Sequence, residues 1–449
     1  MTTVLAQPQP KGLLADASAL IRLSAPNMLA QCGLMLMGLT DTFMIGRISA
    51  VEMGGVALGN GVSFVFIVFA IGLVMAIEPL ASQAAGASEP REAYGWYQQG
   101  LWAATLMGLP LIVAMFVSIQ ILPHLGVTPA VVAATVPYLL WRLPGIPFNA
   151  MYSASRSYLT SVQRTRPIIV AVVLANVANF AFDYVLLFEL DMGAAGIGAA
   201  TSVSRILMFA IAARSALVHR PEGTPATVRP DFHRISQIFR IGWPIGLQMM
   251  VEVGLFSLVG IMVARMGAIE LAGHQIALNL ASATFMTAVG LAIGTTTLVG
   301  HRIGAGDTEG ARRIGAVAVM IGGMFMGVCG VCFLVFDTTL ARLFAPHDET
   351  VVQTGATLLH IAALFSVSDG IQAVSAGALR GAGDTKWIFY ANAIAHWLIA
   401  MPVGFYTTQV LGWGAEGLWY GLTAGLTVVA IFLSYRFWML TKTAVARVG

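Results

Sequence analysis

Long apolar stretches separated by short polar segments dominate this chain from residue 24 to residue 435. Each stretch runs for about 20 residues, the length that an α-helix needs to cross the hydrocarbon core of a bilayer. The pattern predicts roughly twelve membrane-spanning helices. Their approximate bounds are 24–44, 54–77, 97–120, 131–153, 168–188, 193–213, 242–263, 273–298, 314–335, 351–376, 387–410 and 414–435. We therefore expect an all-α polytopic membrane protein.

The composition supports this class of protein. Hydrophobic residues make up 57% of the 449 residues and charged residues only 10%, whereas a soluble chain carries about 25% charged residues. The formal net charge of +3 gives no indication of a nucleic-acid partner. The three cysteines, Cys32, Cys329 and Cys332, fall within predicted spans, where we expect them to act as small packing residues. The expected partner of most of this surface is the lipid bilayer.

The charges in the loops predict an orientation. On one side of the predicted spans the only basic residues are Arg47, Arg265 and Arg342, and nearly all other Lys and Arg residues outside the spans lie on the opposite side. By the positive-inside rule the Lys- and Arg-rich side is cytoplasmic. An even number of spans then places both termini in the cytoplasm. We expect a multi-pass protein of the cell's inner (plasma) membrane.

The two halves of the chain are a repeat of each other. The offset is 218 residues, as from position 47 to position 265, and the matched pairs include Arg22/Arg240, Pro26/Pro244, Met44/Met262, Arg47/Arg265 and Glu52/Glu270. Each half holds six spans in the same orientation, which predicts two pseudo-symmetric six-helix bundles. Parallel repeats of this kind are typical of secondary transporters, with the substrate path between the halves. The predicted parts are a cytoplasmic N-terminal segment 1–22, an N-lobe 23–218, a cytoplasmic linker 219–238, a C-lobe 239–436 and a cytoplasmic tail 437–449.

Acidic residues in the first half occur where the repeat does not require them. Asp41 aligns with Val259, so the common fold does not demand a carboxylate there. Asn179 and Asp183 lie one turn apart on one helix face, and Thr201 of the next span can reach the same level. Asp41, Asn179, Asp183 and Thr201 would together offer oxygen ligands to Na⁺ or hold a proton between two carboxylates. The alternative is that these residues only form hydrogen bonds between helices.

The second half has its own polar positions within spans. Gln248 and Glu252 lie four residues apart on one face, and Asp369 lies in the tenth span. His274 and Gln275 follow each other in the eighth span. Ionisable groups at this depth indicate function, so we expect this set to bind a cation, a proton or the substrate. The alternative for His274 is a hydrogen bond between helices.

Two arginines, Arg142 and Arg205, also fall within predicted spans. The sequence leaves two roles open for them, because they can neutralise the acids or extend toward a membrane surface.

Pro26 interrupts the first span and is a candidate point of conformational change, since proline removes a helix hydrogen bond.

Three motifs give the chain a resemblance to a known family. They are "LTDTFMIGR" in the first span, "AGHQIAL" in the eighth and "ALRGAGDTK" after the tenth. With the six-plus-six repeat, they resemble the multidrug and toxic compound extrusion (MATE) family, NorM-like branch, over essentially the whole chain. The resemblance implies a V-shaped pair of six-helix bundles that exports amphipathic, often cationic, compounds in exchange for Na⁺ or H⁺.

The resemblance also implies roles for particular residues. Asp41, Asn179, Asp183 and Thr201 match the family's first-lobe cation site. Glu252 and Asp369 match its second-lobe acids, and Pro26 matches a proline at which bending has been proposed. Phe365 departs from the NorM-type pattern, which has a tyrosine there. Loss of that hydroxyl weakens the case for a metal ion in the second lobe.

These observations predict a secondary multidrug antiporter, a monomer without a cofactor, whose partners are small amphipathic or cationic drugs. The alternative within transport is a lipid-linked oligosaccharide flippase, which would need a cationic cavity for its pyrophosphate substrates. An enzyme is not expected, because the sequence has no Ser-His-Asp, HExxH or dense His/Cys arrangement. The choice between Na⁺ and H⁺, the drug spectrum, the stoichiometry and the lobe that binds substrate stay open.

Overall fold

The computed structural model describes residues 12–124 and 126–448, and almost all of them are helical. The α-helices are α1 (Leu13–Gly46), α2 (Ala50–Val74), α3 (Ile77–Gly86), α4 (Pro90–Ile121), α5 (Pro129–Arg142), α6 (Gly145–Ser161), α7 (Arg166–Tyr184), α8 (Ala194–Val218), α9 (Phe232–Ala264), α10 (Ala268–Gly304), α11 (Thr308–Val335), α12 (Asp337–Arg342), α13 (Glu349–Gly381), α14 (Thr385–Ile394), α15 (Met401–Gln409) and α16 (Gly414–Leu440). A 3₁₀ turn, η1 (Leu122–His124), and two π-helical segments, η2 (Val185–Glu189) and η3 (Ala395–Ala400), complete the set.

The expected all-helical membrane architecture is confirmed. The described residues contain 11 helices long and apolar enough to cross a membrane, or up to 12 if a bent pair is counted as one span. Residues 1–11 of the predicted N-terminal segment, and Gly449 of the predicted tail, lie outside the described residues. Helix α1 already begins at Leu13 and continues into the first span.

The bent pair is α5 and α6, which meet at an angle of 49°. Between them lie Leu143 and Pro144. Proline has no backbone N–H and disfavours a helical residue before it, which explains a break at this place. Arg142 is the last residue of α5, so it lies at the break, just before the first turn of α6 and within the bent pair.

The chain forms two compact units, and their boundaries fall inside two helices. The described part of one unit comprises residues 12–28 and 247–448, and that of the other comprises residues 29–124 and 126–246. The boundary in α1 lies two residues after Pro26, and the boundary in α9 lies two residues after Pro244. Each unit therefore takes part of the first helix of each half. The lobe boundaries expected from the sequence, 23–218 and 239–436, stay predictions.

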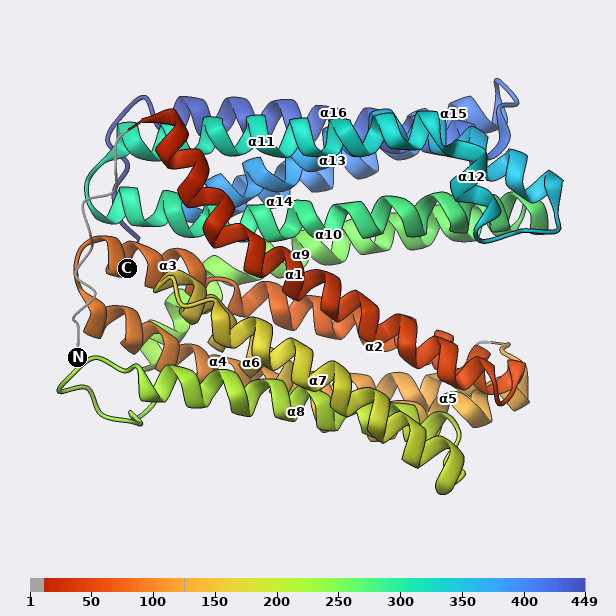
Figure 1. Ribbon diagram of the computed structural model, residues 1–449, viewed down its shortest axis with the longest axis horizontal. Helices are drawn as coiled ribbons and strands as arrows, with labels where there is room; N and C mark the ends of the chain where they lie inside the picture. Colours follow the sequence, from red (N-terminus) through yellow and green to blue (C-terminus); the bar gives the residue numbers. More distant parts are fainter. Residues whose placement is uncertain (1–11, 125, 449) are drawn as a thin grey trace. The chain divides into compact units, whose positions relative to one another are not determined.

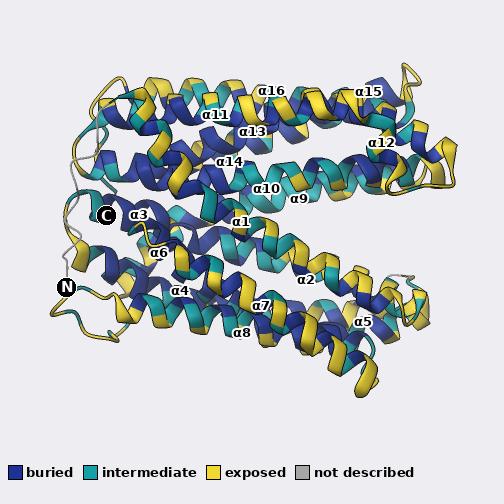
Figure 2. Cartoon of the chain, viewed as in Figure 1, coloured by how far each residue is buried: buried dark blue, intermediate teal, exposed yellow. Residues whose placement is uncertain are grey.

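In the unit of residues 29–246, α6 packs against α4 and α8, and α2 packs against α5. Helices α7 and α8 run side by side (Figure 1). In the unit of residues 12–28 and 247–448, α13 packs against α10, α11 and α16. Most of α13 is buried (Figure 2), as expected of the central helix of a bundle.

In each unit, glycines let two helices pack closely. These pairs are α9 with α2 in the unit of residues 29–246, and α10 with α1 in the other unit. In α9, Gly242 and Gly246 lie against Leu73 and Phe69 of α2, and a Cβ atom at either glycine would overlap the backbone of α2. The glycines are four residues apart and lie on one face, which is the small-xxx-small pattern of membrane helix pairs. Apolar burial cannot drive helices together in lipid, so this close contact stabilises the packing of α9 on α2.

The matching contact in the other unit uses glycines of α10. Gly290 lies against Met28, and Gly294 lies against Ser24 of α1. These positions follow the offset of the repeat, because Ser24 and Met28 correspond to Gly242 and Gly246 of α9. The same crossing therefore occurs once in each unit, and Gly72 of α2, the counterpart of Gly290, also lies against Gly246.

An ion-pair network holds the start of α1 in its unit. Asp16 is only 2% exposed and pairs with Arg302 of α10 at 3.2 Å and with Arg313 of α11. Arg302 also pairs with Asp307 at 3.0 Å. Because Asp16 and Arg302 are both largely withdrawn from water, loss of one partner would leave a buried charge.

The segment between the halves is docked on the unit of residues 29–246. Residues 219–231 are not helical, and side chains of α4 bind their carbonyl groups. Gln98 Nε2 donates to the carbonyl of Pro225 at 2.9 Å, and Trp102 Nε1 donates to that of Val228 at 2.9 Å. The segment is thus fixed along α4.

We expect Asp16→Asn to lower the free energy of unfolding by about 3 kcal/mol, because it leaves Arg302 and Arg313 without their buried carboxylate. Thermal unfolding of the purified protein in detergent measures this as a lower Tm. The matched control is Glu349→Gln, since Glu349 forms an exposed pair with Arg342 at 2.8 Å and its loss should leave the Tm unchanged. Equal Tm values for wild type and Asp16→Asn would contradict a stabilising network.

Candidate functional site

Four of the predicted residues meet inside the unit of residues 29–246. Asp41 comes from α1, Asn179 and Asp183 from α7, and Thr201 from α8. Thr201 Oγ1 donates to Asp41 Oδ2 at 3.2 Å, and the side chains of Asn179 and Asp183 lie near Asp41 and interact with it electrostatically. All four are buried, Asn179 and Asp183 completely. We call these four residues the N-lobe cluster.

Local packing explains why these residues meet. Gly33 of α1 has no side chain where Val172 of α7 lies, so the two helices approach closely at that level. Asp41 follows Gly33 by about two helical turns, and Asn179 follows Val172 by about the same distance, so both reach the same depth. Helix α8 packs along α7 and adds Thr201.

The N-lobe cluster has unused acceptor atoms. Asp41 Oδ1 and both carboxylate oxygens of Asp183 accept no hydrogen bond from the described residues. Two facing carboxylates repel each other in a buried site unless a proton or a cation lies between them. The described residues contain no group of three or more His, Cys, Asp or Glu side chains that could hold a metal ion. The oxygens of the N-lobe cluster are of the kind that hard cations such as Na⁺ prefer, and the predicted cation site stays a prediction.

A second acidic pair lies in the unit of residues 12–28 and 247–448. Gln248 Nε2 donates to Glu252 Oε2 at 2.6 Å, both on α9. Asp369 of α13 is 5% exposed and close enough to Glu252 for an electrostatic interaction, although no hydrogen bond joins their side chains among the described residues. The structure thus brings Gln248, Glu252 and Asp369 into one region, which we call the C-lobe acids.

His274 and Gln275 do not hydrogen-bond to the C-lobe acids in the described part of the chain. His274 is fully buried, and its Nδ1 accepts a hydrogen bond from Trp419 Nε1 at 3.1 Å. Indole N–H can only donate, so Nδ1 carries no proton and the imidazole is neutral while this bond lasts. Gln275 is exposed. Adjacent residues on a helix point about 100° apart, so both could not face the same acids.

Phe365 takes part in an aromatic cluster. Its ring lies 5.5 Å from that of Trp419 and 6.1 Å from that of Phe256, both edge-to-face. Aromatic pairs of this geometry add packing energy but no oxygen ligand. This arrangement fits the expectation that the second lobe is a poor metal site.

The structure adds one residue to the site that the sequence did not single out, Tyr138 of α5. It is 1% exposed, interacts electrostatically with Asp41 and accepts a hydrogen bond from Arg142 Nη1 at 2.6 Å. The spacing of Tyr138 and Arg142 by four residues was the available signal. Neither Arg142 nor Arg205 forms an ion pair within 4 Å with any described acid.

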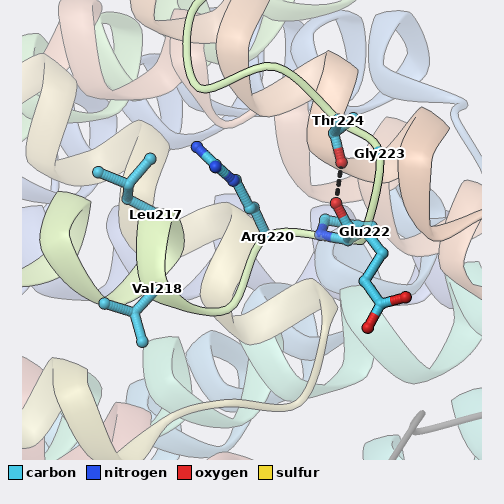
Figure 3. Close-up of a pocket in the computed structure, with 7 residues that line it drawn as sticks. Leu217, Val218, Arg220, Glu222, Gly223 and Thr224 are labelled. Carbon is cyan, nitrogen blue, oxygen red and sulfur yellow. Dashed lines mark hydrogen bonds between the residues drawn. The ribbon is translucent and has the colours of Figure 1, made fainter.

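A cavity of about 640 Å³ lies where α8 ends and the docked segment begins. Figure 3 shows Leu217 and Val218 on one side and Arg220 and Glu222 on the other. The hydroxyl of Thr224 donates to the carbonyl of Pro221 in the turn that closes it. None of the predicted site residues lines this cavity.

Comparison with known proteins gives a match in both halves of the chain. The family model MatE matches residues 26–185 and 244–406. The chain belongs to the MatE family. The predicted resemblance is therefore confirmed, and the protein is a member of a transporter family rather than an enzyme family. The first matched residue is Pro26, and the second match begins at its counterpart, Pro244.

Relatives of this MATE transporter match it over nearly their full length. The probable multidrug resistance protein NorM of Bradyrhizobium diazoefficiens is 33% identical, covering 98% of this chain and 97% of the relative. The multidrug resistance protein NorM of Vibrio cholerae is 30% identical, covering 95% and 96%. The crystal structure of the eukaryotic MATE transporter AtDTX14 has a TM-score of 0.89 at 19% identity, covering 97% of this chain and 99% of that one, which shows the same fold.

We expect Asp183→Asn in this MATE transporter to leave the Tm unchanged or raise it, in contrast to Asp16→Asn. The amide keeps the volume of the carboxylate, removes the repulsion with Asp41 and adds an N–H donor for Asp41 Oδ1. Thermal unfolding in detergent measures the effect, and the double variant Asp41→Asn/Asp183→Asn tests whether the two positions are coupled. A clear loss of Tm on Asp183→Asn would show that the pair is not a site of repulsion.

Proposed function

We propose that this MATE transporter is a secondary multidrug efflux antiporter that exports amphipathic, often cationic, compounds in exchange for H⁺ or Na⁺. The observation that carries the proposal is the electrostatic coupling of the buried carboxylates of Asp41 and Asp183 inside predicted spans, with Asn179 and Thr201 near them. Such a site changes its charge when it gains or loses one cation, as a coupling site requires. The multidrug resistance names of the NorM relatives support the proposed substrate class.

The proposed mechanism is alternating access. A coupling ion changes the balance between two conformations only if it binds them with different affinity. Binding at the N-lobe cluster involves α1, which passes from one compact unit to the other two residues after Pro26. Proline removes a backbone hydrogen bond, so we propose that α1 changes its bend there when the charge on Asp41 changes.

The C-lobe acids have a separate proposed role. Glu252 accepts a hydrogen bond from Gln248, and the Asp369 side chain is buried, with 5% of it exposed. Arg380 interacts electrostatically with Glu252. Two neighbouring carboxylates in a membrane still attract cations. We propose that Glu252 and Asp369 bind either a proton or the cationic group of the drug. Monomeric state, inner-membrane location and cytoplasmic termini belong to the same proposal.

The alternative function is a lipid-linked oligosaccharide flippase. Its substrates carry pyrophosphate, so its cavity would be basic. Arg142 and Arg205 would favour such a function, but four acids also lie in helices that could span a membrane and outnumber them: Asp41, Asp183, Glu252 and Asp369. The relatives' names also favour drug export.

We expect Asp41→Asn to lower ethidium efflux from cells that express the transporter by about tenfold or more, because it removes a charged ligand of the coupling ion. Fluorescence of cell-bound ethidium measures the efflux. The matched control is Asn176→Ala on α7, since among the described residues the Asn176 amide donates to the carbonyl of Val172 of its own helix and has no other hydrogen-bond partner. Unchanged efflux by Asp41→Asn, at equal expression, would overturn the role of Asp41.

The coupling ion is identified by imposing each gradient separately on proteoliposomes. Efflux driven by a Na⁺ gradient at equal pH on both sides indicates Na⁺, and efflux driven by a pH gradient without Na⁺ indicates H⁺. Efflux driven by neither gradient would contradict antiport with these ions.

A further inference from the structure

The cavity at the end of α8 has no role in the proposed transport mechanism. Its volume is about 640 Å³, and ligand sites commonly measure roughly 300–1,000 Å³. Residues 217, 218 and 220–224 line it, so α8 and the docked segment both contribute, and all of them belong to the unit of residues 29–246. The cavity is therefore large enough for a group the size of a phospholipid headgroup.

One wall of the cavity is apolar and lies at the end of a predicted span. Helix α8 is apolar enough to cross a membrane and ends at Val218. Leu217 and Val218 are 44% and 59% exposed, although both are apolar. The residues that follow them, from 219 to 231, are not helical and are mostly polar. This wall is therefore placed where the acyl chains of the bilayer meet the headgroups.

Arg220 gives the cavity a positive charge. In Figure 3 its guanidinium extends on the side of Leu217, whereas the carboxylate of Glu222 points the opposite way. Arg220 forms no ion pair within 4 Å with an acid among residues 12–124 and 126–448. It interacts electrostatically with Tyr94, whose phenol is neutral at physiological pH. The charge of Arg220 is therefore available to a ligand.

A second guanidinium borders the cavity. Arg91, at the start of α4, donates from Nε to the carbonyl of Glu222 at 3.1 Å. Gly223 has a φ of +74°, and a Cβ atom there would lie 3.1 Å from Arg91 Nη2, so this guanidinium lies against the cavity lining. The next residue, Glu92, pairs with Arg234 at 3.0 Å, and no acid in the described part of the chain pairs with Arg91. Its Nη donors thus stay available.

We infer that this cavity binds the headgroup of an anionic phospholipid, with the phosphodiester beside Arg220 and Arg91 and the start of an acyl chain against Leu217 and Val218. The donor fork of arginine matches phosphate oxygens, and basic pockets at the ends of spans suit such headgroups. Inorganic phosphate shares the charge but has no acyl chain for the apolar wall. An arginine that only interacts with the dipole of α8 would give no preference among lipids.

Two lipids with the same acyl chains test the inference. Phosphatidylglycerol carries one negative charge, whereas the headgroup of phosphatidylcholine has no net charge. Native mass spectrometry of the purified full chain gives the Kd for the first bound molecule of each lipid. We expect Arg220→Gln and Arg91→Gln each to weaken phosphatidylglycerol binding by about fivefold, which corresponds to about 1 kcal/mol, and to leave phosphatidylcholine binding unchanged.

Two further variants control for charge and for folding. Arg220→Lys retains the charge and should keep most of the preference for phosphatidylglycerol. Arg229→Gln removes the same charge from the docked segment at an exposed position outside the cavity lining, and should leave both Kd values unchanged. An equal loss of both lipids on Arg220→Gln, or an equal loss of phosphatidylglycerol on Arg229→Gln, would overturn the inference.

Inorganic phosphate separates the two sources of the negative charge. A lipid site keeps its phosphatidylglycerol in excess inorganic phosphate, and Leu217→Ser should weaken that binding severalfold because the acyl chain loses an apolar contact. Displacement of phosphatidylglycerol by inorganic phosphate, or an unchanged Kd on Leu217→Ser, would show that the lipid assignment is wrong. Binding is measured without an ion gradient, so the result does not depend on the proposed antiport.

Discussion

Hydrocarbon accepts neither an unpaired backbone group nor an isolated charge, and this constraint governs the whole molecule. It explains why the spans are helical, because a helix satisfies its own backbone. It also explains why charged side chains inside the spans are few and lie beside other polar groups. Asp41 lies with Thr201, Glu252 lies with Gln248, and Arg142 lies with Tyr138. In such a protein, a charge without a partner indicates a ligand more strongly than it would in a soluble core.

The same solvent changes what holds the helices together. Because lipid is as apolar as leucine, helices associate through close contact, and glycine allows it. Gly246 against Phe69 and Gly290 against Met28 are such contacts, and they occur at corresponding places in the repeat. Both lie near the points where α1 and α9 pass from one compact unit to the other. Each of the helices α1 and α9 therefore has both a close glycine contact and a proline near its unit boundary.

Periodicity and the repeat were sufficient to predict the spans and the N-lobe cluster, because Asn179 and Asp183 share a helix face and Asp41 stands out from its counterpart Val259. Periodicity alone does not say how His274 and Gln275 lie relative to the acids, since a list of polar residues does not say which face is buried, and their role stays a prediction. The region around Arg142 was also beyond prediction. It depends on the break between α5 and α6, and an apolar stretch that contains one proline does not reveal a bend of 49°.

Divergence between the halves gives the two acidic regions different surroundings. In the first half the acids adjoin two arginines through Thr201, so positive and negative groups lie side by side. In the second half Glu252 and Asp369 have only Gln248 as a hydrogen-bond partner among the described residues, and negative charge predominates. Arg142 and Arg205 interact electrostatically with Asp41, and Arg380 interacts with Glu252, so basic residues at different positions of the repeat offset the acids of the two halves.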